Sequence, residues 1–146
     1  MAGTVLLVIT EGFDDMAYLS NQVILEEAGN DVIPVSGESG ALKGETSSVM
    51  TVSISDALSQ DIPYVAMILI GGNGLQNINE LEAMVTEFHQ DGKIIGAIGS
   101  GIEILKKVGI NSVSDDGNIL MEGNIITMKI PERSEEFAEK LAGLIP

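Results

Sequence analysis

The sequence contains no cysteine and only one histidine in 146 residues. Without cysteine the chain cannot form disulfide bonds, thiolate metal sites or a cysteine nucleophile. Aromatic residues are also scarce, at 3% of the chain, so Ile, Leu, Val, Ala and Met must supply most of a buried core. The hydrophobic fraction of 45% is large enough for such a core. A folded domain is therefore expected rather than a disordered chain.

Basic residues are few as well. The chain has 7 Lys and Arg against 22 Asp and Glu, a net charge of −15. Nucleic acids and anionic membranes both attract Lys and Arg, so neither is an expected partner. No apolar stretch is long enough to span a bilayer, and the N-terminus lacks the basic segment of a secretion signal. We expect a soluble, cytoplasmic protein whose acidic surface favours solubility.

The length of the chain indicates a single domain over residues 1–146. Continuous apolar runs of strand length predict buried strands at 4–10, 31–36, 64–72 and 93–98. Amphipathic segments that follow strands predict helices within 11–30, at 79–90, at 100–109 and at 133–144. Less regular residues at 37–62 alternate as short exposed strands do, and residues 119–128 indicate a hairpin with Glu122 and Gly123 at its turn.

Several residues give these elements finer detail. Asp14 and Asp15 suit the start of the first helix, and its apolar stripe is predicted at Met16, Leu19, Val23 and Ile24. Pro34 lacks a backbone donor, which favours a sheet edge for its strand. In the helix at 79–90, Asn79 with Glu82 is predicted to form a capping box. The buried stripe of that helix is predicted at Leu81, Met84, Val85 and Phe88. The last helix is predicted to have Ser134 as its cap and to bury Phe137, Ala138 and Leu141.

Alternation of buried strands with helices predicts a parallel sheet covered by helices on both faces. Ligands of such sheets bind beyond the carboxyl ends of the strands. Three loops are expected to converge at that edge, over residues 11–15, 71–77 and 99–101.

The same three loops, in this order, carry a resemblance to the ThiJ/PfpI family, which shares a superfamily with class I glutamine amidotransferase domains. The similar segments are VLLVITEGFDDMAYLSNQVILEEAG, ILIGGNG, GKIIGAIGSGIEIL and EGNIITMKIPERSEEFAEKLAGL. The resemblance implies a flavodoxin-like, three-layer α/β/α sandwich with a mostly parallel sheet and a small C-terminal hairpin. It also implies a homodimer.

This sequence departs from the family at its reactive positions. Members that resemble it carry a cysteine in an Ala-Ile-Cys-x-Gly elbow, where this chain has Gly99. Many members place a glutamate early in the first helix, where this chain has Ala17. The histidine that members have near the elbow has no counterpart before the last hairpin. The resemblance therefore implies the fold and argues against the usual cysteine chemistry.

Ser100 follows the glycine of the elbow. The resemblance implies that its backbone N–H belongs to an oxyanion hole, together with the N–H of Gly72. A Gly-x-Ser-x-Gly signature is not met, because residue 98 is Ile. Nucleophilic use of Ser100 would need a base within hydrogen-bond reach, for which Glu11 or Asp14 are the acidic candidates. The alternative is a serine that begins a helix.

Other polar groups near this edge have two interpretations each. Glu11, Asp14 and Asp15 are either an acid/base or hard-cation cluster or the start of a helix. Gly71, Gly72, Asn73 and Gly74, which end the strand predicted at 64–72, form either an anion-binding nest or a tight turn. His89 lies at the opposite edge from the elbow and is expected on the surface. No metal or cofactor is expected.

Three functions remain open. The first is a non-catalytic protein that binds a small anion or carbonyl metabolite, or keeps a vestigial pocket. That pocket is expected to contain Glu11, Asp14, Ala17, Gly71, Gly72, Asn73, Gly99, Ser100 and Gly101. The second is a weak hydrolase, deglycase-like or peptidase-like enzyme that uses Ser100 with an acidic partner. The third is a dimeric structural or interaction protein.

Overall fold

A computed structural model describes residues 3–146, so the first two residues of the expected domain lie outside the described part. The strands are β1 (Thr4–Val8), β2 (Asp31–Ser36), β3 (Gly40–Lys43), β4 (Ser48–Ser53), β5 (Tyr64–Ile70), β6 (Ile94–Ile98), β7 (Ile119–Glu122) and β8 (Ile125–Met128). The α-helices are α1 (Asp15–Glu27), α2 (Ile54–Ser59), α3 (Leu81–Gln90), α4 (Gly101–Lys107) and α5 (Ser134–Leu144). Two 3-10 helices are η1 (Leu75–Asn77) and η2 (Pro131–Arg133).

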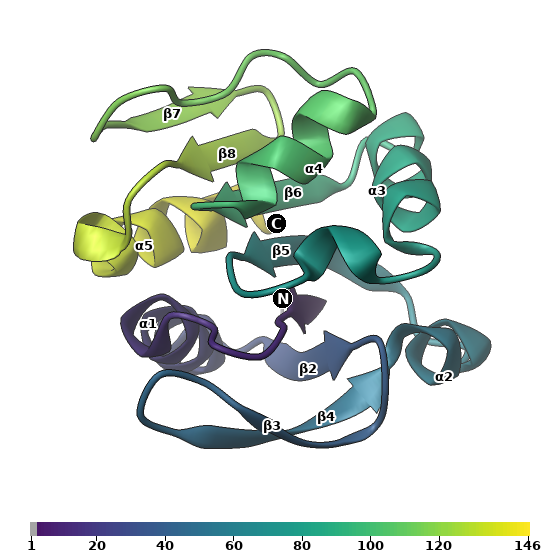
Figure 1. Cartoon of the computed structure of the whole chain (residues 1–146). Coiled ribbons are helices and arrows are strands. Elements are labelled where there is room, and N and C mark those ends of the chain that lie inside the picture. Colours follow the sequence, from purple (N-terminus) through teal and green to yellow (C-terminus); the bar gives the residue numbers. More distant parts are fainter. Residues whose placement is uncertain (1–2) are drawn as a thin grey trace.

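All the strands belong to one eight-stranded sheet in the order β3-β4-β2-β1-β5-β6-β8-β7. The inner strands pair in parallel, while β3 and β7 pair antiparallel with β4 and β8 at the two edges. Figure 1 shows α1 and α5 on one face of the sheet and α2, α3 and α4 on the other. The expected three-layer α/β/α sandwich with a C-terminal hairpin is confirmed.

Alternation along the inner strands builds a core on each face of the sheet. In β1, Leu6 and Val8 pack with residues of α3 and α4, whereas Val5 and Leu7 pack with residues of α1 and α5. All four side chains are fully buried. A strand buried on both faces has no polar side to show, which explains its continuous apolar sequence. No helix among residues 3–146 combines the length and apolarity that a membrane crossing needs.

The first helix buries a different face from the one predicted. Asp14 caps α1 as expected, because its carboxylate accepts a hydrogen bond from the Ala17 N–H at 2.8 Å. The buried residues of α1 are Ala17, Tyr18, Asn21 and Leu25. The predicted stripe was wrong, since Met16, Leu19 and Val23 are 57%, 50% and 48% exposed. Helix α1 packs against α5 and β2 through the face that carries Ala17, Tyr18, Asn21 and Leu25, so the predicted residues lie on the side that faces away from them.

Pro34 does not mark a sheet edge, because β2 lies between β1 and β4. The prediction failed for a local reason. Pairing of β2 with β4 starts at Val35, one residue after the proline. The missing N–H of Pro34 therefore removes no bond from that ladder.

The starts of α2 and α3 also differ from the predictions. A glutamate, Glu80, occupies the cap of α3 at a φ of 75°, without a side-chain cap bond, so the capping box of Asn79 and Glu82 is not formed. The predicted buried stripe of α3 is confirmed at Leu81, Met84, Val85 and Phe88. The short helix α2 was not predicted; Ser53 caps it by accepting from the Asp56 N–H at 3.0 Å.

The turn of the C-terminal hairpin and the start of α5 both differ from the predictions. Glu122 pairs with Ile125, so the turn consists of Gly123 and Asn124 and lies one residue later than predicted. Ser134 is the first helical residue rather than the cap, and its hydroxyl donates to the Pro131 carbonyl at 2.6 Å.

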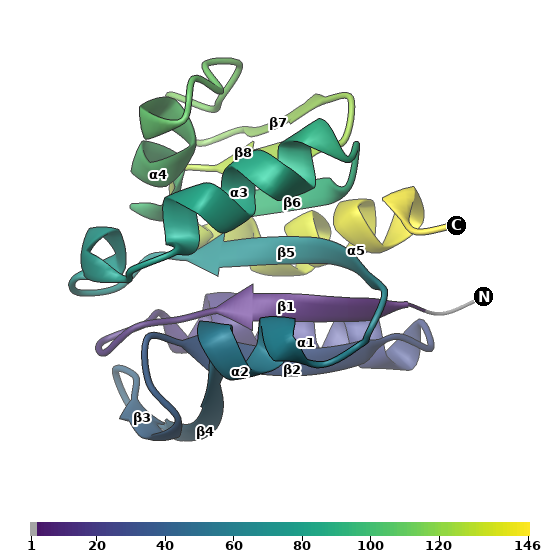
Figure 2. The ribbon, with the colours of Figure 1, turned by 90° about the vertical axis from the view of Figure 1, so that its right-hand side faces the viewer.

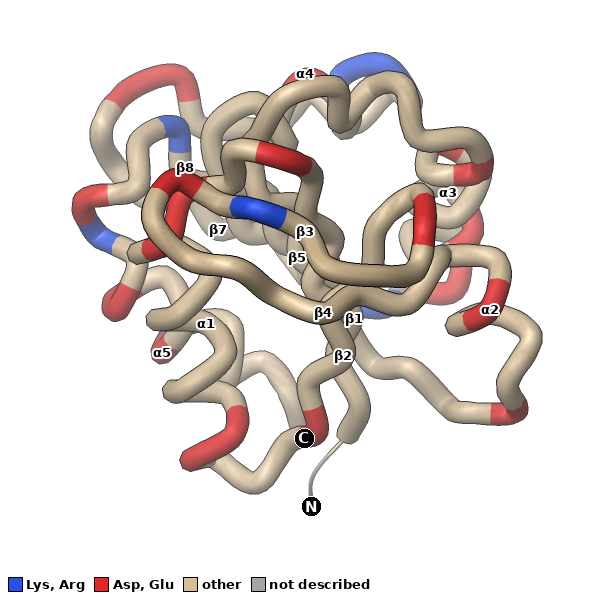
Figure 3. Tube along the Cα trace, turned by 60° about the horizontal axis from the view of Figure 1, so that its bottom comes forward, with Lys and Arg blue, Asp and Glu red and all other residues tan. Residues whose placement is uncertain are grey.

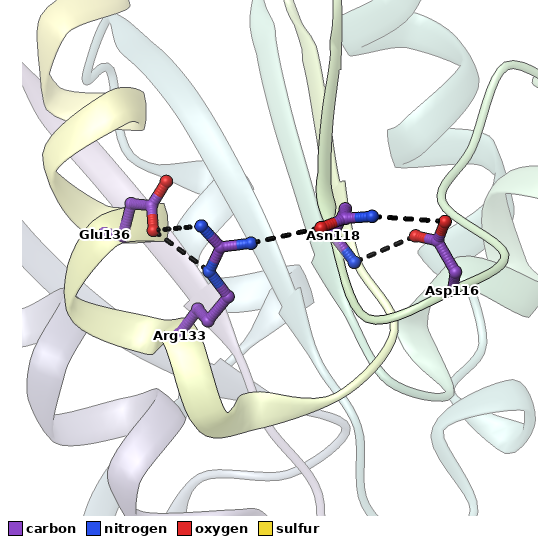
Figure 4. Close-up of polar contacts among 4 residues, drawn as sticks. All are labelled: Asp116, Asn118, Arg133 and Glu136. Carbon is purple, nitrogen blue, oxygen red and sulfur yellow. Dashed lines mark hydrogen bonds and ion pairs between the residues drawn. The ribbon is translucent and has the colours of Figure 1, made fainter.

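Figure 4 shows how the loop before β7 meets the start of α5. Arg133 donates to Glu136 at 3.0 Å and to the Asn118 side-chain oxygen at 3.3 Å. The Asn118 backbone N–H in turn donates to Asp116 at 2.8 Å. These exposed contacts link the loop before β7 to the start of α5.

Candidate functional site

The three predicted loops meet beyond the carboxyl ends of β1, β5 and β6. The Asn73 N–H donates to the Glu11 carbonyl at 2.8 Å, and the Gly71 N–H donates to the Ile98 carbonyl at 3.0 Å. Figure 2 shows the arrowheads of β1 and β5 pointing to this end of the sheet, with the loop that holds η1 beyond them. The expected convergence is therefore present.

Glycines allow these backbones to approach one another. A Cβ atom on Gly101 would lie 2.5 Å from the Leu69 carbonyl oxygen. A Cβ atom on Gly72 would lie 2.6 Å from the Thr10 hydroxyl oxygen. Both distances are too short for a side chain, so α4 and the loop after β5 depend on glycine for their closeness to neighbouring strands.

The elbow between β6 and α4 is formed by Gly99. Its φ of +63° lies in the left-handed region, where residues with a Cβ are strained. The nearest atom to an added Cβ would be the Lys129 carbonyl oxygen at 3.8 Å. There is consequently room for a side chain at the elbow, but glycine leaves only hydrogen there.

Ser100 occupies the cap position of α4, but its side chain makes no cap bond. The residue is exposed, and its hydroxyl oxygen would lie 2.8 Å from a Cβ atom on Gly71. The hydroxyl therefore faces the glycine loop. Within residues 3–146 the backbone N–H groups of Ser100 and Gly72 donate to no backbone acceptor.

Two cavities lie at this end of the sheet. The elbow cavity, of about 340 Å³, is lined by Gly99, Ser100, Glu103, Lys106, Asp115 and Lys129 among others. The hairpin cavity, of about 450 Å³, is lined by Thr10, Glu11, Ser36, Glu38, Asn73 and Glu80 among others. The predicted pocket is thus divided: Gly99 and Ser100 line the first, and Glu11 and Asn73 line the second. The other predicted residues, Asp14, Ala17, Gly71, Gly72 and Gly101, line neither.

The acidic candidates are separated by this arrangement. Asp14 is engaged as the cap of α1, and Glu11 lies in the hairpin cavity rather than beside Ser100. Asp15 accepts hydrogen bonds from the Ser47 hydroxyl at 2.7 Å and from the Thr46 N–H and hydroxyl. These bonds, led by that of the Thr46 hydroxyl, lower the pKa of Asp15 below its ordinary value of 3.8. Asp15 therefore ties α1 to the β3–β4 turn.

Ala17 is fully buried. His89 is exposed and nearly ends α3, so the whole of β6 separates it from the elbow in the chain. Within the described residues, no three acid or histidine side chains gather closely enough to hold a metal ion. No reactive pair is brought to Ser100 by these residues.

The sequence model of the DJ-1/PfpI family matches residues 3–115, which include the glycine loop and the elbow. The chain belongs to the DJ-1/PfpI family. It is 27% identical to an uncharacterised protein of Methanocaldococcus jannaschii, over 93% of this chain and 78% of that protein. It is also 32% identical to the catalase HPII of Mycobacterium avium over 75% of this chain, but it spans only 17% of the length of that catalase.

The fold of the DJ-1/PfpI family is also found by comparison of structures. A ThiJ/PfpI domain protein from Brachyspira murdochii superposes with a TM-score of 0.83. The alignment covers 97% of this chain and 95% of that protein at 20% sequence identity. At this level of identity the likeness concerns the fold.

Sequence reasoning missed the lysines of the elbow cavity. Lys106 is in the last turn of α4, and Lys129 follows β8. Because β8 pairs in parallel with β6, with Met128 beside Ile98, the residue after Met128 arrives next to the elbow. The predicted hairpin would have located Lys129 had its second strand been assigned to the parallel sheet beside β6.

Proposed function

We propose that this DJ-1/PfpI protein is non-catalytic and binds a small anion or carbonyl metabolite in the elbow cavity. The single observation that carries the proposal is Gly99, which leaves hydrogen at the elbow where a reactive side chain would stand. The buried Ala17 adds no acid to this region. The Ser100 hydroxyl faces Gly71, and the acids Glu11 and Asp14 are engaged elsewhere.

The chemistry of the elbow cavity supports an oxygen-bearing ligand. Ser100, whose backbone N–H has no backbone acceptor within residues 3–146, lines this cavity together with two lysines. Lys106 forms an exposed ion pair with Glu103 at 3.5 Å, and Lys129 donates to the Asp115 carbonyl at 3.4 Å. Exposed contacts of this kind are weak, so both ammonium groups can turn to a carboxylate, phosphate or carbonyl oxygen.

Titration calorimetry with inorganic phosphate and with pyruvate tests this proposal. We expect saturable binding of at least one probe, weakened about tenfold by Lys129→Met because a charged hydrogen bond is lost. Lys93→Met is the matched control, since Lys93 lies 4.8 Å from the centre of the Phe88 ring and outside the elbow cavity. Absence of binding at millimolar concentrations, or equal weakening by both variants, would contradict the proposal.

A homodimer is a second proposed property, favoured by the exposed stripe of α1. Met16, Leu19 and Val23 lie on one face of this helix and are about half exposed. Apolar side chains gathered on one helix face favour association with another protein surface. Their retention on the face opposite the core is explained if a second copy of this chain covers them.

Light scattering at micromolar concentration tests the dimer. We expect the unmodified protein to have twice the 15.4 kDa mass of one chain, and the Leu19→Glu variant to have the mass of one chain. Leu58→Glu is the matched control, because Leu58 is similarly exposed, at 42%, but belongs to α2. A single-chain mass for the unmodified protein would contradict this property.

A further inference from the structure

The glycine loop after β5, with the sequence GGNG at residues 71–74, contains an asparagine that is followed directly by a glycine. Every other asparagine of the chain is followed by a residue that has a Cβ atom. The difference matters because the side-chain carbonyl of an asparagine can be attacked by the backbone nitrogen of the next residue. A glycine at that position leaves its nitrogen unobstructed, and asparagine is one of the chemically labile residues of proteins.

The structure leaves both reacting groups of this pair accessible. Asn73 is exposed and Gly74 is partly exposed. The Gly74 N–H donates to no backbone acceptor within residues 3–146. Asn30 is a contrast, because it is buried and the N–H that follows it, that of Asp31, donates to the Gly3 carbonyl at 2.9 Å. No backbone hydrogen bond therefore has to break before the Gly74 nitrogen reacts.

The loop is held on both sides of the peptide bond between Asn73 and Gly74. On one side the Asn73 N–H donates to the Glu11 carbonyl at 2.8 Å. On the other, the Gly74 carbonyl accepts from the Asn77 N–H at 2.9 Å, at the start of η1. Gly74 itself has a φ of 74°, in the left-handed region that glycine tolerates. These bonds position the loop without using the Gly74 N–H.

We propose that Asn73 is a site of spontaneous deamidation in the folded protein. The Gly74 nitrogen attacks the Asn73 Cγ, so that an N–Cγ bond forms and the Cγ–Nδ2 bond breaks. The proton of the Gly74 N–H passes through water to the departing nitrogen, which leaves as ammonia. One water molecule then opens the succinimide ring. Cleavage at Cγ gives aspartate, and cleavage at the main-chain carbonyl gives isoaspartate, whose backbone runs through Cβ and Cγ.

Either product places a carboxylate in acidic surroundings. Asn73 lines the hairpin cavity together with Glu11, Glu38 and Glu80, and that lining includes no Lys, Arg or His. Figure 3 shows the same imbalance around β3 and β4, where acidic positions outnumber basic ones. The Asn73 carboxamide also lies over the loop before α1, with its nitrogen 2.8 Å from the position of a Cβ atom on Gly12. Like-charge repulsion at residue 73 therefore weakens the contact between the glycine loop and the end of β1.

Incubation of the folded protein in mildly alkaline buffer, followed by peptide mass spectrometry, tests the proposal. Labelling by an isoaspartyl methyltransferase distinguishes isoaspartate from aspartate. We expect Asn73 to be converted to both products before any other asparagine. Asn111 is the internal control, because it is also exposed but is followed by Ser112. Absence of conversion at Asn73, or faster conversion at Asn111, would overturn the proposal.

The same incubation in urea separates the folded loop from the bare sequence. We expect conversion of Asn73 in both states, and reaction of the unfolded chain alone would overturn a site in the folded protein. Gly74→Ala should abolish the conversion over the same period, because a Cβ atom at residue 74 obstructs the attacking nitrogen. Gly40→Ala is the matched control, since Gly40 also has a positive φ but lies in β3. Undiminished conversion in unfolded Gly74→Ala would overturn the assigned nucleophile.

Asn73→Asp reproduces the charge of one product and tests its consequence. We expect a lower urea midpoint than that of the unmodified protein, with a difference that shrinks as salt is raised. Asn111→Asp adds the same charge outside the hairpin cavity and should have a smaller effect. Equal shifts in the two variants would overturn the local repulsion at residue 73. The site does not depend on a ligand in the elbow cavity, so it stands or falls separately from the binding proposed there.

Discussion

Gly99 changes two properties of the elbow at once. At a φ of +63° the position is strained for residues that carry a Cβ atom, and glycine removes this strain. Glycine also leaves no side-chain atom other than hydrogen at position 99. The loss of a cysteine nucleophile here is what the resemblance to the family predicts, and it stays a prediction. The sign of φ could not be predicted with it, because a glycine permits both signs.

Gly99→Ala should lower the free energy of unfolding by about 1 kcal/mol, because alanine is strained in the left-handed region. Urea denaturation measures the change. Gly143→Ala is the matched control: this glycine is in α5, has no positive φ and has no atom within 4 Å of an added Cβ. The control should be neutral or stabilising by up to about 1 kcal/mol. Equal effects of the two substitutions would contradict the strain at Gly99.

Asp15 should make stability depend on pH under acidic conditions. Its pKa in the folded protein is lowered below 3.8, chiefly by hydrogen bonds from the Thr46 and Ser47 hydroxyls. The corresponding stabilisation is complete above the unfolded-state pKa and is lost as the pH falls through the folded-state value. In Asp15→Asn the unfolding free energy should therefore decrease less steeply below pH 3.8. The Thr46→Val, Ser47→Ala variant should show the same reduced dependence; an unchanged slope in both would contradict the account.

At the scale of elements, the sequence predicted the kinds of segment better than their faces and caps. Continuous apolar runs located β1, β5 and β6 because those strands are buried on both faces. The face of α1 was wrong, because Ala17 and Asn21 are buried while larger apolar residues are exposed. Hydrophobicity alone cannot choose between two stripes of one helix when the neighbouring helix, α5, decides which residues fit.

The turn between β6 and α4 should present residue 99 to the elbow cavity. Because the chain has no cysteine, Gly99→Cys introduces a single thiol whose reaction with iodoacetamide can be followed by mass spectrometry. We expect rapid labelling of this thiol, since an added Cβ has no neighbour closer than 3.8 Å. Ala97→Cys, at a fully buried position two residues earlier in the elbow strand, should be protected. Protection of both thiols would show that the elbow does not open into the cavity.

At the scale of the whole molecule, the order of the loops was predictable but their division into two cavities was not. The loops meet because parallel strands end at one edge. The elbow cavity is completed by Lys129 from the end of β8, and the hairpin cavity by Glu38 and Glu80 from two other loops. These residues are distant in sequence, and only the strand order of the sheet brings them to their sites.

The non-catalytic role that we propose for this DJ-1/PfpI protein requires that nothing at its elbow performs chemistry. The most direct test compares turnover of methylglyoxal, an ester and a thioester by the unmodified protein and by Ser100→Ala. We expect equal rates for the two proteins, because the Ser100 hydroxyl faces the glycine loop and makes no cap bond. Turnover that is clearly faster in the unmodified protein and is lost with the Ser100 hydroxyl would contradict it.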